Sequence, residues 1–366
     1  EEHDSSYKQT EKMPTYNARD LAIIRAKFID IPIVLGSATP SLESYYNAKN
    51  NKYKFHPLME RYGNANYPDI QLIDMFKEKN QYKKSIFSKK LINGIHECLK
   101  NKEQIILLHN RRGYATILFC NECNYIFTSK KTSVPLTYHK FNNKLMCHHT
   151  DESYNMPRVC PECSSCSLQL KGIGTETIED EIKNIFSDIK ITRFDADTTS
   201  KKNKHKKLLE KFEKGDSDIL IGTQMVSKGF DFHNVTLVGV INSDIGLFTP
   251  DFRSGERIFQ LLYQVCGRSG RGKKSGKAII QTFNINDVYI NSATMMNTEK
   301  YYNVSLADRL ELSYPPFTKI VRILLKGPDS KKVKSAIDQV VNFIKSENFE
   351  ILGPSAAPIE KINNYY

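Results

Sequence analysis

The sequence predicts an α/β protein built on parallel sheets. Five short runs rich in Ile, Val and Leu show no apolar–polar alternation, as expected of strands covered on both faces; they are residues 31–35, 105–109, 218–221, 235–241 and 278–282. Helix-like stretches lie between several of these runs, at residues 88–100, 176–186, 204–214 and 252–266. Strands that alternate with helices are typical of parallel sheets. In such sheets, function concentrates in the loops at the carboxyl ends of the strands.

Length and composition limit the classes of protein that remain. The chain has 366 residues, of which 40% are hydrophobic and 26% charged. These values predict two or three globular domains and exclude a disordered or collagen-like chain. No apolar run approaches the ~18 residues of a membrane span, and no signal segment opens the sequence, so we expect no membrane partner. The net charge of +12 favours a polyanionic partner, which on charge alone is either nucleic acid or an acidic membrane face.

Two regions depart from the strand–helix alternation. Residues 119–171 are irregular and carry most of the eight cysteines, which indicates an insertion. After about residue 291 the character changes again, with a rigid extended break at residues 314–317 that contains two prolines. A strand-like run at 320–326 and a helix-like stretch at 331–345 follow, and they predict a small separate α+β unit.

The first chemical motif is the acidic opening at residues 1–4. After a buried strand, such a run suits ATP hydrolysis, in which one carboxylate orders Mg²⁺ and the next polarises the attacking water. A frayed terminus is the alternative. The second motif, with Ser37 and Thr39, follows the run at 31–35. Its hydroxyls could reach between two domains and sense phosphate, or they could simply cap a helix.

Two further motifs carry groups that suit a polyphosphate. Residues 222–231 follow an expected strand; their glycines permit close backbone approach, Thr223 offers a hydroxyl to phosphate, and Asp231 suits a sugar hydroxyl. At a helix end, Arg268 and Arg271 are three residues apart and form a fork. An arginine that reaches across a cleft supplies charge needed in the transition state. Alone, this motif could be a solvated basic helix; the order of all four motifs makes that interpretation improbable.

The order of these motifs is that of the superfamily 2 helicases. More narrowly, the chain resembles the bacterial primosomal protein N′ (PriA) family of replication-restart helicases, through residues 1–9, 36–43, 110–114 and 222–229 and the cysteine-rich insertion. The resemblance implies two RecA-like helicase lobes with parallel sheets. It assigns residues 1–72 to the C-terminal part of lobe 1, 73–292 to lobe 2 with a zinc-binding insertion at 119–171, and 293–366 to a partial C-terminal domain.

The resemblance also implies a function. Family members are ATP-dependent 3′→5′ DNA helicases that act at stalled or abandoned replication forks and restart replication through primosome assembly. The implied ligands are ATP and Mg²⁺, and the implied partners are forked and single-stranded DNA, single-stranded-DNA-binding protein and other primosome proteins. The implied location is the bacterial cytoplasm, at the fork. We expect a monomer.

Roles carry over from the family to matching positions. Glu1 would be the catalytic base, and Gln264, Arg268 and Arg271 would face the γ-phosphate. Ser37 and Thr39 would couple hydrolysis to domain movement, and Gly229 and Asp231 would contact the nucleotide. The DNA-binding candidates are Tyr7 and Tyr16, through base stacking, and Arg111, Arg112, Thr175 and Thr223, through backbone phosphates. For Thr175, which lies where a helix begins, a plain helix cap is an equal alternative.

The sequence departs from the family pattern at its start. The family places an Asp, the Mg²⁺ ligand, immediately before Glu1, and a phosphate-binding loop further upstream. Neither is among these 366 residues. We therefore expect these residues alone to lack ATP hydrolysis, and a longer natural protein to be an ATPase.

Two cysteine pairs predict a structural metal site. Cys120 and Cys123 form one C-x-x-C knuckle, and Cys160 and Cys163 form another. Two knuckles supply the four thiolates of a tetrahedral zinc site, which leaves no open position for hydrolysis. Free buried or reactive thiols are the alternative.

The family nests a second Cys₄ zinc between these knuckles. In register, its four positions fall on Ser129, Thr132, Cys147 and Thr150, so only one cysteine remains. Hydroxyls are poor zinc ligands, and we predict that this second ion is lost. Rescue by His139, His148 or His149 together with Cys147 ranks well below loss.

Two other functions compete with the helicase. A non-catalytic scaffold that binds forks and loads primosome proteins, with little unwinding activity, would not need the arginine-rich motif at 264–271. A zinc-containing RNA-binding module would not need the resemblance to a DNA helicase family beyond the motor motifs. Stimulation of ATP hydrolysis by forked DNA separates the three.

Overall fold

The computed structural model describes residues 1–10, 13–58, 68–81, 85–109, 117–132, 134–139, 143–147, 150, 152–172, 174–194, 204–223, 232–247, 249, 251–269, 276–345, 347, 349–357 and 359–366. These residues form two compact units. Unit 1 comprises Glu1–Arg112 and Ile182–Ile320, and unit 2 comprises Gly113–Glu181 and Val321–Tyr366. Among the described residues, none of the helices combines the length and the apolar character needed to cross a bilayer.

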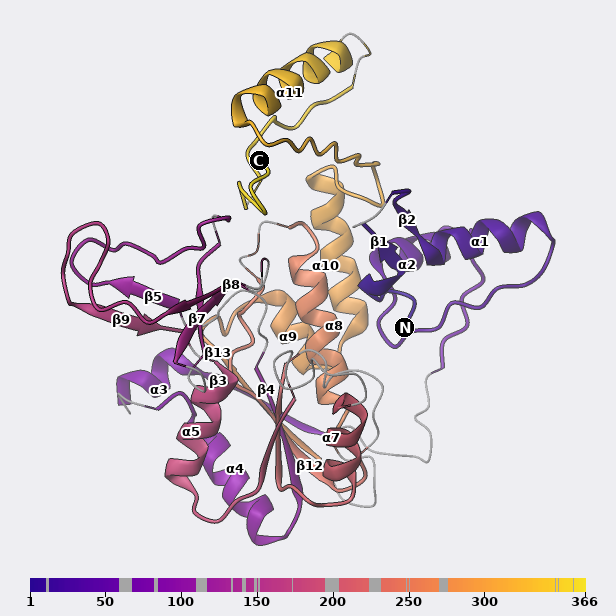
Figure 1. Cartoon of the computed structure of the whole chain (residues 1–366). Helices are drawn as coiled ribbons and strands as arrows, with labels where there is room; N and C mark the ends of the chain where they lie inside the picture. Colours follow the sequence, from indigo (N-terminus) through magenta and orange to yellow (C-terminus); the bar gives the residue numbers. More distant parts are fainter. Residues whose placement is uncertain are drawn as a thin grey trace. The chain divides into compact units, whose positions relative to one another are not determined.

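Unit 1 is built on a parallel six-stranded sheet, as the sequence predicts (Figure 1). Its order is β10-β11-β4-β12-β13-β3, and every pair is parallel. The strands are β3 (Asp69–Asp74), β4 (Gln104–Leu108), β10 (Ile191–Phe194), β11 (Ile219–Gly222), β12 (Val235–Val240) and β13 (Lys277–Thr282). The helices of unit 1 are α1 (Ala18–Phe28), α2 (Leu42–Lys49), α3 (Met75–Gln81), α4 (Lys89–Lys100), α7 (Lys204–Glu213), α8 (Ser254–Cys266), α9 (Val288–Thr294) and α10 (Thr298–Glu311).

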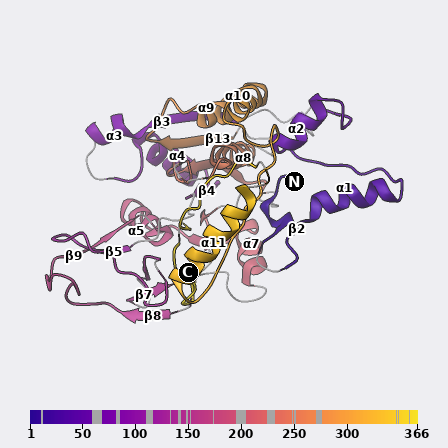
Figure 2. The ribbon, with the colours of Figure 1, turned by 90° about the horizontal axis from the view of Figure 1, so that it is seen from above.

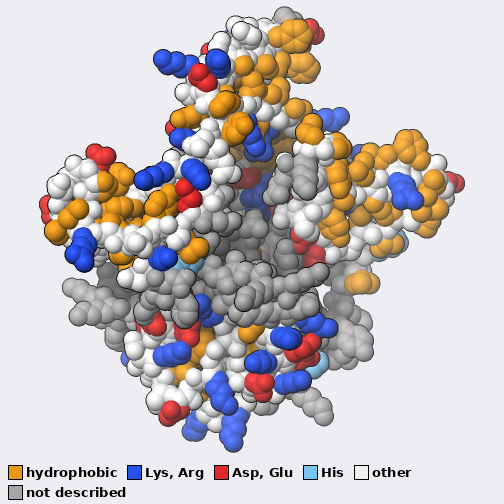
Figure 3. All heavy atoms as spheres, viewed as in Figure 1, with side chains coloured by type: hydrophobic (Ala, Val, Ile, Leu, Met, Phe, Trp, Pro, Cys, Tyr) orange, Lys and Arg blue, Asp and Glu red, His pale blue; other side chains and the backbone are white. Residues whose placement is uncertain are grey.

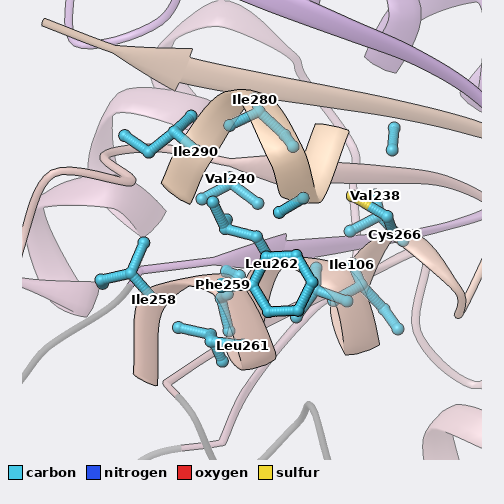
Figure 4. Close-up of a cluster of buried hydrophobic side chains, with 14 of the residues drawn as sticks. Ile106, Val238, Val240, Ile258, Phe259, Leu261, Leu262, Cys266, Ile280 and Ile290 are labelled. Carbon is cyan, nitrogen blue, oxygen red and sulfur yellow. The ribbon is translucent and has the colours of Figure 1, made fainter. Parts of the chain in front are cut away.

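The central strands are apolar on both sides because helices pack on both faces. On one face, Ile106, Val238 and Ile280 lie against Phe259 and Leu262 of α8 (Figure 4). Helices α8, α9 and α10 lie side by side in both ribbon views (Figures 1 and 2).

The opposite face carries α4, which begins where the Ser88 side chain accepts a hydrogen bond from the Leu91 amide. Gly94 lets this helix approach closely, since a Cβ there would lie 3.2 Å from Ile279 and 3.3 Å from Leu237.

Two predicted strands are absent, and both predictions were wrong. Residues 31–35 have no strand structure, and Ile31 and Val34 are 54% and 91% exposed. Residues 320–326 are likewise without strand structure. The reason is the same in both cases, because no described strand lies beside either run to complete the backbone hydrogen bonds that a strand needs. In Figure 3, apolar side chains of α1 and the following segment are exposed accordingly.

Unit 2 contains an antiparallel sheet of order β8-β7-β6-β5-β9. The strands are β5 (Ile117–Cys120), β6 (Thr137–His139), β7 (Lys144–Cys147), β8 (Glu152–Asn155) and β9 (Leu168–Lys171). Its small core contains Leu118, Phe127, Leu136, Leu145 and Cys147. Unit 2 also holds the helix α11 (Ser330–Lys345), which the sequence predicts. Helix α5 (Thr175–Ile185) crosses from unit 2 into unit 1.

Candidate functional site

The acidic opening and the Ser37 segment lie together in unit 1. The Glu2 backbone amide donates to the Gly36 carbonyl at 3.0 Å. The Ser37 hydroxyl lies 3.1 Å from a Glu1 carboxylate oxygen and 2.8 Å from Nδ1 of His3. Two motifs that are more than thirty residues apart in the sequence therefore form one polar cluster, as their assignment to a single site requires.

Gln264 brings the last motif into the same cluster. Its side-chain nitrogen lies 3.2 Å from Nε2 of His3, and it comes from the C-terminal turn of α8. An amide nitrogen can only donate, so His3 accepts at Nε2 and carries its proton on Nδ1. Hydrogen bonds then run in one direction, from Gln264 to His3, from His3 to Ser37, and from Ser37 to Glu1.

The electrostatics of His3 agree with this arrangement. Burial lowers the pKa of His3 from its ordinary value of 6.5, and this effect outweighs the neighbouring Glu1 and Glu2 carboxylates. His3 is therefore neutral at pH 7, as its acceptor role at Nε2 requires. Glu1 remains 45% exposed at its side chain, so its carboxylate is open to solvent.

Glu2 was not identified as a site residue by sequence reasoning. Its side chain is buried and accepts from the Ser41 amide at 2.6 Å, from Arg19 Nη1 at 2.8 Å and from the Ser44 hydroxyl at 3.0 Å. Ser41 is the N-cap of α2. Glu2 thus ties the acidic opening to the start of this helix. The sequence shows only that Glu2 is an acidic residue next to Glu1; its burial, which distinguishes it, is visible in the structure alone.

Several predicted residues lie outside the described residues. These are Arg111, Arg112, Gly229, Asp231 and Arg271. The strands that precede four of them are described: β4 precedes Arg111 and Arg112, and β11 precedes Gly229 and Asp231. The carboxyl ends of β4 and β11 are neighbours, because Leu108 pairs with Gly222 and the His109 amide donates to the Gly222 carbonyl at 2.9 Å. The chain that enters residues 110–112 therefore starts beside Thr223, which is half-buried.

The remaining predicted DNA contacts differ in exposure. Tyr7 and Tyr16 are 42% and 45% exposed, at a short hairpin in which Gln9 pairs with Tyr16. This hairpin is formed by β1 (Lys8–Gln9) and β2 (Tyr16–Asn17). Thr175 is only 1% exposed, as the first residue of α5. Over the described part of the face seen in Figure 3, basic and acidic side chains are intermixed.

Four cysteines form a cluster that can hold a metal ion. The sulfurs of Cys120, Cys123, Cys160 and Cys163 all lie within 4.8 Å of one another. Two of the distances, Cys120 to Cys163 and Cys123 to Cys160, are 3.5 and 3.6 Å. Thiolates that surround one zinc at about 2.3 Å in a tetrahedron lie about 3.8 Å apart, so the donor set fits a zinc ion.

The two knuckles share one backbone geometry. In the first, the Cys120 carbonyl accepts from the Asn124 amide at 2.9 Å; in the second, the Cys160 carbonyl accepts from the Ser164 amide at 3.0 Å. Asn124 and Ser164 both adopt positive φ angles, of 58° and 57°. A backbone hydrogen bond from Cys123 lowers the pKa of Cys120 to about 7, whereas the pKa values of Cys123 and Cys163 are raised, so Cys120 ionises more readily than those two thiols.

Cys166 and the four residues at the family's second zinc site are not part of this cluster. Cys166 is exposed and is not among the four grouped cysteines. At the second position, the hydroxyls of Ser129 and Thr150 donate to the same Glu152 carboxylate oxygen, at 2.5 and 2.9 Å. The other two positions also meet, because Thr132 Oγ1 lies 3.6 Å from Cys147 Sγ. Among the candidate rescuing histidines, His139 lies on β6, and His148 and His149 fall outside the described residues.

Comparisons with known proteins agree with the sequence resemblance. The model of the primosomal protein N C-terminal domain matches residues 310–366, and that of the helicase conserved C-terminal domain matches residues 163–273. Among solved structures, S. cerevisiae Dbp5 bound to RNA and ADP BeF3 is 14% identical, with 92% of this chain and 60% of that chain covered and a TM-score of 0.38. That likeness is too low to carry an inference.

Curated relatives match along the whole chain. The replication restart protein PriA of Bacillus subtilis is 40% identical over all of this chain and 46% of its own length. Those of Chlamydia pneumoniae and Haemophilus influenzae are 41% and 39% identical, over 47% and 50% of their lengths and 95% and 100% of this chain. The chain spans about half the length of these relatives. With this identity from end to end and both domain models in their expected order, the chain belongs to the PriA family of replication restart proteins.

Proposed function

We propose that this chain supplies part of the motor of an ATP-dependent 3′→5′ DNA helicase, which restarts replication at stalled or abandoned forks. The observation that carries the proposal is the hydrogen-bonded series from Gln264 through His3 and Ser37 to Glu1. Three motifs that suit nucleotide chemistry converge there on one exposed carboxylate. A fork-binding scaffold without catalysis has no use for this convergence.

In the proposed reaction, Glu1 polarises the water that attacks the γ-phosphate, and Ser37 and His3 hold its carboxylate in place. Arg268 and Arg271 stabilise the charge that develops on the transferred phosphoryl group. Gly229 and Asp231 contact the nucleotide. Mg²⁺ bound with ATP would neutralise phosphate charge.

Two groups of residues are proposed to bind DNA. The exposed rings of Tyr7 and Tyr16 stack on unpaired bases, each stack being worth about 1–3 kcal/mol. Thr223, Arg111 and Arg112 contact backbone phosphates, whereas Thr175 is buried at the first residue of α5 and is therefore not proposed as a DNA contact. Because the Tyr7–Tyr16 hairpin leads directly from the residue 1–4 segment, base stacking can influence the position of Glu1. Single-stranded-DNA-binding protein and primosome proteins are the proposed partners.

The four-cysteine cluster is proposed to hold one structural zinc ion, with the second family position metal-free. We also propose that the two lobes, the insertion and the C-terminal domain have the residue boundaries that the family resemblance implies.

ATP turnover of the natural full-length protein tests this function. Forked DNA should stimulate turnover strongly, single-stranded RNA should stimulate it less, and E1Q should abolish it because an amide cannot act as the base. Glu97, an exposed carboxylate of α4 that pairs with Lys277, provides the control variant E97Q, which should behave as wild type. Weak stimulation by the fork would favour the scaffold, and stronger stimulation by RNA would favour an RNA-binding module.

A further inference from the structure

A cluster of four charged side chains joins three helices of unit 1. Glu43 lies in the first turn of α2, Arg253 and Glu256 lie at the start of α8, and Arg309 lies in the last turn of α10. Glu256 and Arg309 are each only 5% exposed at their side chains, and Glu43 is 20% exposed. Helix α2 begins at Leu42, shortly after Ser37 and Thr39, and Gln264 lies in the last turn of α8.

The geometry of this cluster is specific. Arg253 donates to both oxygens of Glu43, with Nη2 to Oε1 at 2.6 Å and Nη1 to Oε2 at 3.0 Å. Glu256 accepts at Oε2 from Arg253 at 3.2 Å and from Arg309 at 3.1 Å. Its other oxygen accepts from the backbone amide of Leu42, the first residue of α2, at 3.1 Å. A carboxylate of α8 thus holds the beginning of α2.

The charges in the cluster compensate one another. Burial would raise the pKa of Glu43, but the hydrogen bond and charge of Arg253 outweigh it and hold this pKa below its ordinary value. Burial raises the pKa of Glu256, and the nearby Glu43 adds to this effect. A buried ion cluster contributes little net stability compared with apolar packing, but it can specify one arrangement of the groups it joins.

Uncharged contacts fix the same short segment. The Tyr302 hydroxyl of α10 donates to the Pro40 carbonyl at 2.8 Å, and its ring stacks on Tyr45 of α2 with centroids 3.8 Å apart. Gln260 of α8 donates to the Thr39 carbonyl at 3.4 Å. Residues 39–45 are therefore anchored to α8 and α10 by contacts of residues that precede and follow Leu42 and Glu43 in the sequence.

We propose that Glu43, Arg253, Glu256 and Arg309 are positioning residues that lock residues 39–45 to α8, and so set the place of Ser37 relative to Gln264. This inference rests on the proposed ATPase function. Among the described residues, the hydrogen bonds and ion pairs of the cluster reach neither Glu1 nor Gln264, so its loss should lower kcat rather than weaken ATP binding. An error of about 1 Å in such a site can cost a hundredfold in rate.

The test is a double-mutant cycle in the natural full-length protein, with E43Q, R253Q and the double variant. Each single variant should lower the fork-stimulated kcat about tenfold with KM for ATP within about twofold, and the double variant should be no worse than either single. R253K keeps the charge but loses the bidentate contact with Glu43, so its kcat should lie between those of wild type and R253Q. The control cycle is E97Q and K277Q, an exposed pair of the same unit, which should leave kcat unchanged.

Hydrogen exchange of the amides of residues 41–45 provides a readout that does not depend on ATP turnover. It should accelerate about tenfold or more in E43Q and stay unchanged in E97Q. Unchanged exchange in E43Q would overturn the anchoring, and accelerated exchange with unchanged kcat would overturn the positioning role. If wild type shows no DNA-stimulated turnover, the proposed function fails, while the exchange result still decides whether the cluster anchors α2.

Discussion

Replacement of Cys120 by serine removes one of the four sulfurs in the cysteine cluster and should abolish metal binding. Cys120 ends β5 and is fully buried, and the other three sulfurs lie within 4.8 Å. A serine hydroxyl is a poor zinc ligand, so three thiolates would remain without the fourth. Structural zinc contributes roughly 10–16 kcal/mol of apparent binding free energy, which is folding free energy for a site that forms only on folding.

The apolar core beside this site is too small to replace that contribution. Its buried members are Leu118, Phe127, Leu136, Leu145 and Cys147, and a core of such a size supplies only about 3–5 kcal/mol. We therefore expect C120S to lose its zinc and to unfold the segment around β5 to β9, while the parallel sheet of unit 1 persists.

Zinc content per chain and limited proteolysis measure the two parts of this prediction. Wild type should carry one zinc per chain and resist cleavage between residues 120 and 168. C120S should carry none and be cut there. C166S is the matched control, because Cys166 is exposed and outside the cluster; it should keep its zinc. A C120S protein with full zinc content, or a C166S protein without zinc, would refute the reasoning.

Three further predictions concern other parts of the chain. C147S should leave zinc at one ion per chain, because Glu152 and two hydroxyls occupy the second position; a fall from two ions to one would contradict this. His3 has a pKa below 6.5, so the folded state binds fewer protons than the unfolded chain just below that pH. The free energy of unfolding should thus decrease as the pH is lowered from 7 to 5. In denaturant titrations, H3Q should remove this dependence on pH; an equal dependence in H3Q would disprove the role of His3. G239A should lower the free energy of unfolding by about 1–3 kcal/mol, since its Cβ would lie 2.7 Å from Leu107. Unchanged stability would contradict this and would mean that the buried leucines move aside without cost.

Part of the fold was readable from sequence because burial on both faces leaves a simple signature. Strands β4, β11 and β12 are buried at every residue, and each corresponds to a run that is predominantly apolar. The same signature failed at residues 31–35 and 320–326, because an apolar run becomes a strand only where a partner strand lies beside it. Strand β3 (Asp69–Asp74) was missed because polar residues interrupt its apolar ones, as suits a strand at the edge of the sheet.

The candidate site shows a similar division. The cysteine cluster was predictable, because two cysteines separated by two residues can bind the same metal ion. The proximity of Glu1, Ser37 and Gln264 followed from motif order through family resemblance, and the structure brings these three together. The ion pair of Glu43 with Arg253 was not predictable, because its members are 210 residues apart and neither belongs to a spaced motif. Only the packing of α2 on α8 reveals it.

The central claim is that arginines beyond α8 complete a nucleotide site with Glu1. Fork-stimulated ATP turnover of the natural full-length protein tests it most directly, with R268A compared with R257A. Arg257 is an exposed residue of the same helix that pairs with Asp251. We predict that R268A loses turnover by about a thousandfold or more, keeps its fold and leaves DNA binding intact, while R257A resembles wild type. Wild-type turnover in a folded R268A protein would contradict the account.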